Sequence, residues 1–341
     1  MTHGTQMGRE ILEIPAAVDR LLTAGEAEIA RTADTIRSFD PRYFVSVARG
    51  SSDHAATYLK YATELLLGLP MASVGPSVAS IYRAKLQVDG AVCLSVSQSG
   101  KSTDIVDLAR SMTESGAFSV AITNANNSPL AQVSSSTLDI EAGPELSVAA
   151  TKTFVNSIVA GLWLLASVKQ DDELLTAIRQ LPDALEKATC CDWTDAASAI
   201  SGTSLYVLGR GPSWAIANEA ALKFKETCQL HAESYSSAEV MHGPVSIVDS
   251  GFPVLAFAAN DAAEVALADI ADQLAEKGAK VFATSPLVER ANCLPHIRTG
   301  HWLTDPIAGI VSFYGMVEQI AVSRGINPDA PRHLKKVTET V

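Results

Sequence analysis

The sequence has no cysteine or histidine pattern that would indicate a disulfide framework or a metal site. Its five cysteines form no CxxC pair and follow no regular spacing, and its seven histidines include no HxH or HExxH pair. Unpaired thiols are typical of a reducing compartment. We therefore predict a cytoplasmic protein without a disulfide and without a bound metal.

Basic residues are scarce as well. The chain has 26 lysines and arginines against 38 aspartates and glutamates, a formal net charge of -12. Wrapping a nucleic acid or lying on an anionic membrane requires a basic surface, so neither partner is expected. Any phosphate that this protein binds must be held locally, by a small number of donors.

Long apolar runs are also missing. Residues 1–19 carry Arg9 and Glu10 among their apolar positions and do not resemble a signal peptide. The most apolar later stretch, residues 154–168, contains Asn156 and is shorter than the ~20 residues that a transmembrane helix needs. We predict that it forms a buried helix.

What the sequence does contain is an internal repeat. With 341 residues, of which 47% are hydrophobic, the chain is long enough for two domains. Residues 43–52 resemble residues 204–213, an offset of 161, and the same offset relates 91–96 to 252–257 and 119–123 to 280–284. The matching residues of the first pair are Arg49, Gly50 and Ser52 with Arg210, Gly211 and Ser213.

The repeated runs predict the fold. Each is short, apolar and without alternation, as in strands that are covered on both faces of a parallel sheet. Between these runs, residues 103–114 and 262–277 show helical periodicity, and each of these predicted helices is followed by a glycine. Alternating strands and helices specify an α/β protein of two tandem doubly wound parallel-sheet domains. The predicted segments are N-terminal helices (1–40), a first domain (41–175), a second domain with a linker helix (176–328) and a tail (329–341).

One loop has the composition of a phosphate site. Ser97-Gln98-Ser99-Gly100-Lys101-Ser102 follows the strand at 91–96 and opens a helix, where free backbone N–H groups and hydroxyls can surround a dianion. The same serines could instead be ordinary turn and helix-cap residues. A nucleotide P-loop would need glycine at position 95, which is Ser95, and Gly209-Arg210-Gly211 lacks the third glycine of a dinucleotide fingerprint. No cofactor is predicted.

A second cluster has the composition of an acid–base site. Glu219, Lys223 and Glu226 are spaced by four and three residues, so on a helix they share one face. A carboxylate beside a lysine can move a proton between adjacent carbons, and His242 in the following loop suits acid–base work. The alternatives, a solvated salt-bridge face and a structural histidine, remain open at this point.

These residues also form part of a longer resemblance. The chain resembles the sugar isomerase (SIS) domain proteins, whose domains are flavodoxin-like, and most closely the isomerase half of glutamine:fructose-6-phosphate aminotransferases. Seven ordered blocks carry the resemblance: residues 7–15, 97–100, 148–154, 219–226, 231–235, 242–244 and 331–336.

The resemblance implies a role for each matching residue. Glu226 would be the base that moves a proton between C1 and C2, His242 would assist ring opening, and Lys336 would meet the open-chain sugar. In the family the histidine comes from a neighbouring subunit, which implies a homodimer with shared active sites. Glu219 and Lys223 would orient the base, while the substrate would be bound by Ser52, Ser97, Gln98, Ser99, Ser102, Val148 and Ala150.

Departures from the family pattern leave the identity of the sugar undetermined. Ala150 replaces a usual serine, Lys101 a usual acidic residue and His333 a usual asparagine. Because Met1-Thr2 leads straight into the first matching block, we expect no glutaminase domain of the kind that the synthase has. We therefore expect deamination of glucosamine 6-phosphate or a related amino-sugar 6-phosphate. The alternatives are a fructosamine-6-phosphate deglycase and a non-catalytic sugar-phosphate-binding regulator.

Overall fold

The structure, a computed structural model, describes residues 4–336 and divides into two compact units. The first-sheet unit consists of Ala16–Glu145, Lys152–Arg179 and the chain from Lys335 on. The second-sheet unit consists of the chain up to Pro15, Leu146–Thr151 and Gln180–Leu334. Of the N-terminal and tail segments predicted from the sequence, residues 1–3 and 337–341 lie outside the described part.

The first sheet has five parallel strands in the order β2-β1-β3-β4-β5. Every residue of β3 is buried, which explains why its sequence is continuously apolar rather than alternating. The strand predicted at residues 91–96 is therefore confirmed. The strands are β1 (Tyr43–Val47), β2 (Met71–Ser73), β3 (Ala91–Val96), β4 (Phe118–Thr123) and β5 (Ser136–Asp139).

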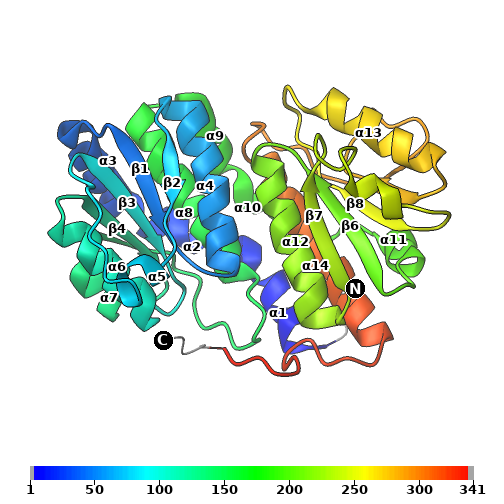
Figure 1. Ribbon diagram of the computed structural model, residues 1–341, viewed down its shortest axis with the longest axis horizontal. Helices are drawn as coiled ribbons and strands as arrows, with labels where there is room; N and C mark the ends of the chain where they lie inside the picture. Colours follow the sequence, from blue (N-terminus) through cyan, green and yellow to red (C-terminus); the bar gives the residue numbers. More distant parts are fainter. Residues whose placement is uncertain (1–3, 337–341) are drawn as a thin grey trace. The chain divides into compact units, whose positions relative to one another are not determined.

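Helices cover both faces of this sheet (Figure 1). Helix α6 packs on β1, β3 and β4, while α3, α4 and α8 pack together on the other side. The buried helix predicted from residues 154–168 is α8. The helices of this unit are α2 (Ile14–Ala24), α3 (Glu26–Phe39), α4 (Ser51–Leu67), α5 (Ser77–Ser80), α6 (Thr103–Glu114), α7 (Pro129–Val133), α8 (Lys152–Lys169) and α9 (Asp172–Arg179).

The second sheet repeats the topology of the first. Its strand order is β7-β6-β8-β9-β10. In both sheets the strand that comes first in the chain therefore lies between the second and the third, and the fourth and fifth follow. The repeat inferred from the sequence is therefore a structural duplication, and two tandem doubly wound α/β domains are confirmed. The strands are β6 (Ser204–Gly209), β7 (His231–Ser236), β8 (Pro253–Ala256), β9 (Lys280–Ala283) and β10 (Asn292–Cys293).

The helices of the second-sheet unit surround this sheet. Pro182 lies in the first turn of α10, as its position in the sequence suggested. The helices are α1 (Gln6–Leu12), α10 (Leu181–Thr189), α11 (Thr194–Ala199), α12 (Pro212–Cys228), α13 (Glu264–Glu276) and α14 (Asp305–Ser323), with a 3₁₀ turn, η1, at Pro244–Ile247.

One helix of the described chain, α14, is long and apolar enough to pass a length-and-hydropathy test for a membrane span. Most of that stretch is buried, and it packs against α10, α11 and α12. Such burial is typical of a core helix in a globular domain.

The strand order fixes where a ligand would bind. In each sheet the first strand lies between the second and the third, so the loops leaving the first and third strands diverge and open a crevice at their carboxyl ends. In the first sheet these are the loops that follow β1 and β3, residues 48–50 and 97–102. The serine-rich loop therefore lies where doubly wound sheets bind their ligands.

Candidate functional site

The serine-rich loop after β3 is held in place by its own backbone. Ser97 N–H donates to the Ile122 carbonyl at 3.1 Å, and the Gly100 carbonyl accepts from Leu130 N–H at 3.1 Å. Ser102 occupies the N-cap position of α6 but makes no cap hydrogen bond with its side chain. Ser102 thus caps α6 by position only, and the residue lines a cavity. Ser97 and Ser99 do act as turn residues, because Ser97 Oγ accepts from Gly100 N–H at 3.2 Å and Ser99 Oγ accepts from Lys101 N–H at 3.3 Å.

Gly100 is required by this loop for two reasons. Its φ of +60° lies in the left-handed region, and a Cβ there would come within 2.2 Å of Ser128 Oγ. Only glycine satisfies both conditions without moving the neighbouring loop. The loop is thus a built, narrow turn.

The loop forms one wall of a cavity of about 560 Å³. The first turn of α4 forms another wall, so two helix N-termini, each a centre of partial positive charge, meet at one place. Five predicted phosphate ligands are brought together here. The lining residues are Ala48, Arg49, Gly50, Ser52, Asp53, Val96, Ser97, Gln98, Ser99, Ser102, Ile105 and Lys336.

Charged side chains of both signs lie at this cavity. The Arg49 guanidinium forms an ion pair with Asp104, whose side chain is buried in the first turn of α6. Burial raises the pKa of the Asp53 carboxyl, a shift that the nearby His54 partly opposes.

Lys336, the tail lysine, also lines this cavity. Its Nζ donates to Glu145 Oε2 at 2.8 Å. Glu145 precedes α8, and its carboxylate also accepts from Thr153 N–H at 3.1 Å and from Thr153 Oγ1–H at 2.6 Å. The first-sheet unit therefore joins the predicted phosphate ligands and the predicted tail lysine in one cavity.

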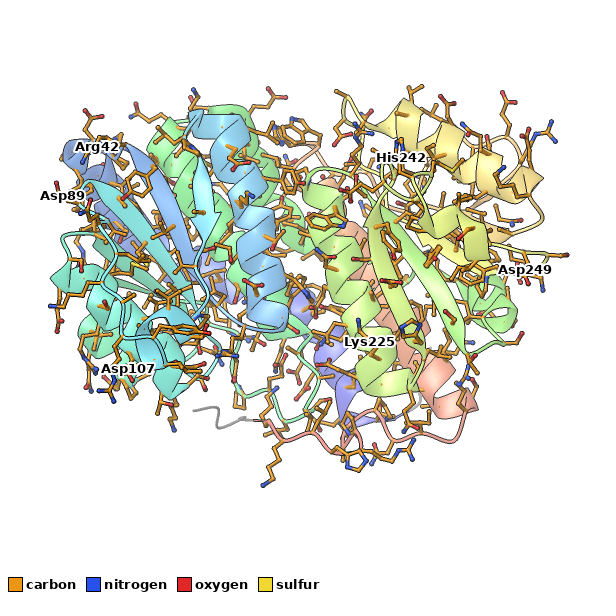
Figure 2. The ribbon with its side chains drawn as sticks, in the orientation of Figure 1. Arg42, Asp89, Asp107, Lys225, His242 and Asp249 are labelled. Carbon is orange, nitrogen blue, oxygen red and sulfur yellow. The ribbon has the colours of Figure 1, made fainter. Side chains whose placement is uncertain are left out.

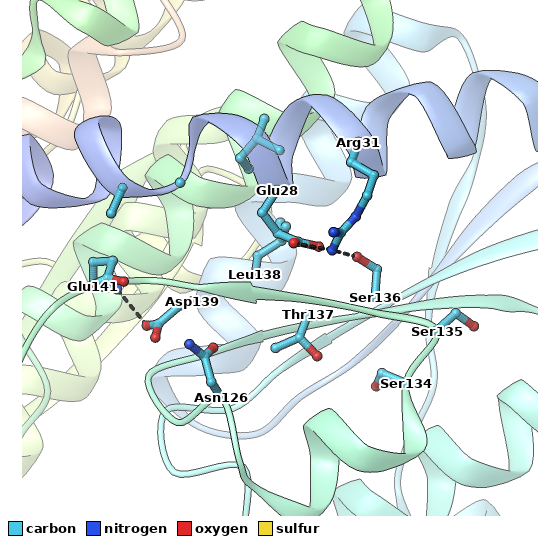
Figure 3. A pocket seen from close by; sticks show the side chains of 13 residues that line it. Glu28, Arg31, Asn126, Ser134, Ser135, Ser136, Thr137, Leu138, Asp139 and Glu141 are labelled. Carbon is cyan, nitrogen blue, oxygen red and sulfur yellow. Dashed lines mark hydrogen bonds and ion pairs between the residues drawn. The ribbon is translucent and has the colours of Figure 1, made fainter.

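A second cavity of the first-sheet unit, of about 420 Å³, runs along β5 beside α3 (Figure 3). Its wall carries the Glu28–Arg31 ion pair and the hydroxyl of Ser136, which donates to Glu28 Oε1 at 3.1 Å. None of the residues predicted from the sequence lines it.

The equivalent loop of the second sheet has lost the phosphate-binding chemistry. Residues 258–263, which follow β8, read Ala-Ala-Asn-Asp-Ala-Ala and offer no hydroxyl. Arg298 donates to the Ala258 carbonyl at 3.0 Å and forms ion pairs with Glu264 and Asp305. The hollow beside this loop is too small for a sugar phosphate. The cavity lined by the predicted phosphate ligands belongs to the first repeat.

The cluster on α12 is not a solvated face. Lys223 and Glu219 have fully buried side chains, with Nζ 3.2 Å from Glu219 Oε1, and Lys223 also pairs with Glu226, which is 21% exposed. Burial alone would lower the pKa of Lys223, but the two carboxylates outweigh it and the pKa lies above its usual range. Lys223 is thus held as a cation between two carboxylates, and the outer one, Glu226, reaches solvent.

His242 lies apart from that cluster in the same unit. It is exposed, in the loop after β7, and no hydrogen bond or ion pair joins it to the α12 cluster within residues 4–336. Figure 2 shows His242 and Lys225, one residue before Glu226, toward opposite ends of α12. Because β7 spans six residues at ~3.3 Å each, roughly 17 Å separate its two ends.

Val148 and Ala150 lie in the short segment Leu146–Thr151, which the second-sheet unit holds at several points. Val148 N–H donates to the Asp329 carbonyl at 3.2 Å. The buried carboxylate of Glu10, on α1, accepts from Leu146 N–H and, at 3.2 Å, from Ser147 N–H. The N-terminal helix and the tail thus fix the backbone of this segment.

Sequence reasoning missed three charged residues of these sites: Arg49, Asp104 and Glu145. Arg49 was visible as part of the repeat, and its position after a strand was the available signal. Glu145 gave no local signal, because its partner Lys336 is 191 residues away. Within the described residues, no group of three or more His, Cys, Asp and Glu side chains is arranged to hold a metal.

One family of known proteins matches the chain twice, once around each sheet. The SIS domain model matches residues 40–167 and again 200–319. A glutamine-fructose-6-phosphate aminotransferase (isomerizing) from Sulfolobus acidocaldarius is 32% identical over 304 residues, which are 86% of this chain and 49% of that protein. The chain spans about half the length of the curated relatives it matches.

Two solved structures are similar along almost the whole chain. A phosphosugar isomerase candidate from Silicibacter pomeroyi DSS-3 is 63% identical, covering 95% of this chain and 100% of that one, with a TM-score of 0.93. The C-terminal domain of glucosamine-fructose-6-phosphate aminotransferase from Francisella tularensis is 26% identical, covering 96% and 99%, with a TM-score of 0.84.

Proposed function

Because the chain belongs to the SIS domain family, we propose that it is a phosphosugar isomerase that deaminates an amino-sugar 6-phosphate, with glucosamine 6-phosphate as the first candidate. The products would be fructose 6-phosphate and ammonia. The observation that carries the proposal is the cavity of the first-sheet unit, where two helix N-termini, four serines and the tail lysine converge.

The phosphate would be bound by neutral donors. Hydroxyls of Ser52, Ser97, Ser99 and Ser102 and the amide of Gln98 line the cavity. Backbone N–H groups at the starts of α4 and α6 add the positive ends of two helix dipoles. This arrangement lets a protein of net charge -12 bind a dianion without an extended basic surface.

The proton transfer would be carried by Glu226. It would remove the C2 proton of the open-chain amino aldose, giving an enolamine, and return a proton to C1. The resulting C2 imine takes up water and releases ammonia. Lys223 and Glu219, both fully buried, would keep the outer carboxylate in one orientation. A solvated ion pair would not fix the base in this way.

We propose deamination rather than amination as the direction of the reaction, on chemical grounds. At neutral pH most ammonia is ammonium, which has no lone pair to attack a carbonyl, so addition from solution is slow. Release needs only water. A fructosamine-6-phosphate deglycase would use the same residues but liberate an amine in place of ammonia, and the product assay described below separates the two.

A non-catalytic regulator is the competing class. Such a module needs the phosphate cavity but has no use for a buried lysine held between two carboxylates. The α12 cluster therefore favours an enzyme, which we propose acts in the cytoplasm.

The position of His242 supports a homodimer. Glu226 lies near the amino end of β7 and His242 beyond its carboxyl end, roughly 17 Å away along the strand. Placement at opposite ends of this strand favours a histidine from a second copy over one from the same copy. We therefore propose that His242 assists ring opening at the site of a second copy of the chain.

The decisive experiment is a coupled assay for ammonia release on glucosamine 6-phosphate, galactosamine 6-phosphate and a fructosamine 6-phosphate. Glu226→Gln should reduce kcat roughly 100-fold or more, the scale of losing a general base. Glu239→Gln, an exposed carboxylate of the same unit, is the matched control and should retain activity. Ammonia release that survives Glu226→Gln would remove the proposed base, and release of a free amine without ammonia would make the protein a deglycase.

A further inference from the structure

The strongest unassigned feature is a buried carboxylate beside the cavity of the first-sheet unit. Glu145 has a side chain with 0% exposure, and neither the sequence analysis nor the proposed reaction gives it a role. It lies directly before the segment that contains Val148, and its carboxylate contacts Thr153 in the first turn of α8. A buried carboxylate is costly unless it is paired and hydrogen-bonded, so its partners indicate what it does.

Two kinds of partner hold Glu145. On one side, Thr153 in the first turn of α8 donates its N–H to Oε1 at 3.1 Å and its hydroxyl to Oε2 at 2.6 Å. The positive end of the α8 dipole adds to this stabilisation. These contacts fix the carboxylate to a long, buried helix.

On the other side lies Lys336, whose Nζ is 2.8 Å from Oε2. The chain that leads to it, residues 332–335, is exposed and has no regular secondary structure. A long lysine side chain on such a segment has much rotamer freedom to lose. The Glu145 carboxylate supplies a fixed acceptor that holds the ammonium at the cavity wall.

We propose that Glu145 is a positioning residue that holds the Lys336 ammonium at the wall of the phosphate cavity. The inference rests on the proposed function only in taking Lys336 as the amine that meets the open-chain sugar. With the phosphate fixed by the serine-rich loop and the amine fixed by Glu145, the two ends of a sugar phosphate are set within one unit.

The first test measures the ion pair without substrate. The protein is treated with a limiting amount of the N-hydroxysuccinimide ester of acetic acid, and acetylation of Lys336 is compared by mass spectrometry with that of its exposed neighbour Lys335. We expect Lys336 to react about tenfold more slowly, as a charge-assisted hydrogen bond of this kind allows. Glu145→Gln should bring the two rates within about twofold of each other.

Thr153→Val is the matched control, because it removes one hydrogen bond to the same carboxylate and leaves the charge in place. It should keep Lys336 slow. Equal reactivity of the two lysines in the wild-type protein, or loss of the difference in Thr153→Val alone, would overturn the assignment.

A second measurement does not depend on the folding of a Glu145 variant. Lys336→Met removes the ammonium that pairs with a buried carboxylate and should lower the Tm by about 4 °C or more, whereas Lys335→Met should leave it unchanged. Equal Tm values for these two variants would overturn the proposal.

Kinetics then connect the pair to the reaction. Glu145→Gln and Lys336→Met should each lower kcat, and the double variant should be no slower than Lys336→Met, because Glu145 acts through the lysine. Additive losses would overturn the positioning role. A wild-type protein that shows the acetylation difference but releases no ammonia would refute the proposed function and leave the ion pair standing.

Discussion

Replacing Lys223 by methionine should destabilise the second-sheet unit far more than an ordinary lysine substitution. The Lys223 and Glu219 side chains are both fully buried and their charged atoms lie 3.2 Å apart. At an effective dielectric constant of ~20, two unit charges at that separation attract by about 5 kcal/mol. Methionine fills similar space but leaves Glu219 buried without this cation.

The expected loss in the free energy of unfolding is about 3–5 kcal/mol, the range found when one partner of a buried pair is removed. Urea-induced unfolding at pH 7, followed by circular dichroism, measures it. Lys225→Met is the matched control: Lys225 is exposed and donates one hydrogen bond, to the Ala232 carbonyl at 3.2 Å. It should cost no more than about 1.5 kcal/mol.

The pH dependence follows from the pKa of Lys223, which the two carboxylates raise above its usual range. A raised pKa of a basic group contributes stability that is fully present below the unfolded-state pKa, about 10.4, and is lost as the pH rises through the folded-state pKa. The contribution of Lys223 should therefore persist from pH 7 to about pH 10 and decline only at higher pH.

A Lys223→Met protein within about 1 kcal/mol of the wild type at pH 7 would show that the cluster is not the buried ion pair argued here.

Three further outcomes are expected. Ser99→Ala should raise the KM for the phosphorylated sugar more than it lowers kcat, because phosphate binding is largely uniform between ground and transition states; steady-state kinetics measure both, and an unchanged KM would contradict the assignment. Gly100→Ala should raise the KM further, since its Cβ would lie 2.2 Å from Ser128 Oγ, and a wild-type KM would show that the loop can shift freely. Mixing Glu226→Gln with His242→Ala should restore partial ammonia release after subunit exchange, because some mixed dimers contain one intact site; no recovery despite demonstrated exchange would place both groups in one copy.

Much of the architecture followed from local patterns. The continuous apolar run at 91–96 can only be satisfied by a strand that is covered on both faces, and β3 is buried throughout. The periodicity at 103–114 gave α6 with both of its ends. The 161-residue repeat predicted two doubly wound domains, and the second sheet has the same strand order as the first.

The sequence also located the serine-rich loop, because a turn between a buried strand and an amphipathic helix must lie at the carboxyl edge of the sheet. It did not show that the equivalent loop in the second unit is closed. There Arg298, which lies more than thirty residues after the loop in the chain, reaches back to the Ala258 carbonyl.

The sequence by itself therefore determined the three repeated pairs of strands, the helices at 103–114 and 154–168, the duplicated doubly wound topology and the loop that faces the crevice, because these depend on patterns among neighbouring residues and on the repeat. Tertiary structure alone decided which charges are buried and which are paired. Spacing placed Glu219 and Lys223 on one helical face but could not say whether that face meets water or the core. Lys336 meets Glu145 across 191 residues of chain, and such a pairing is fixed by the folding of the whole unit rather than by any local pattern.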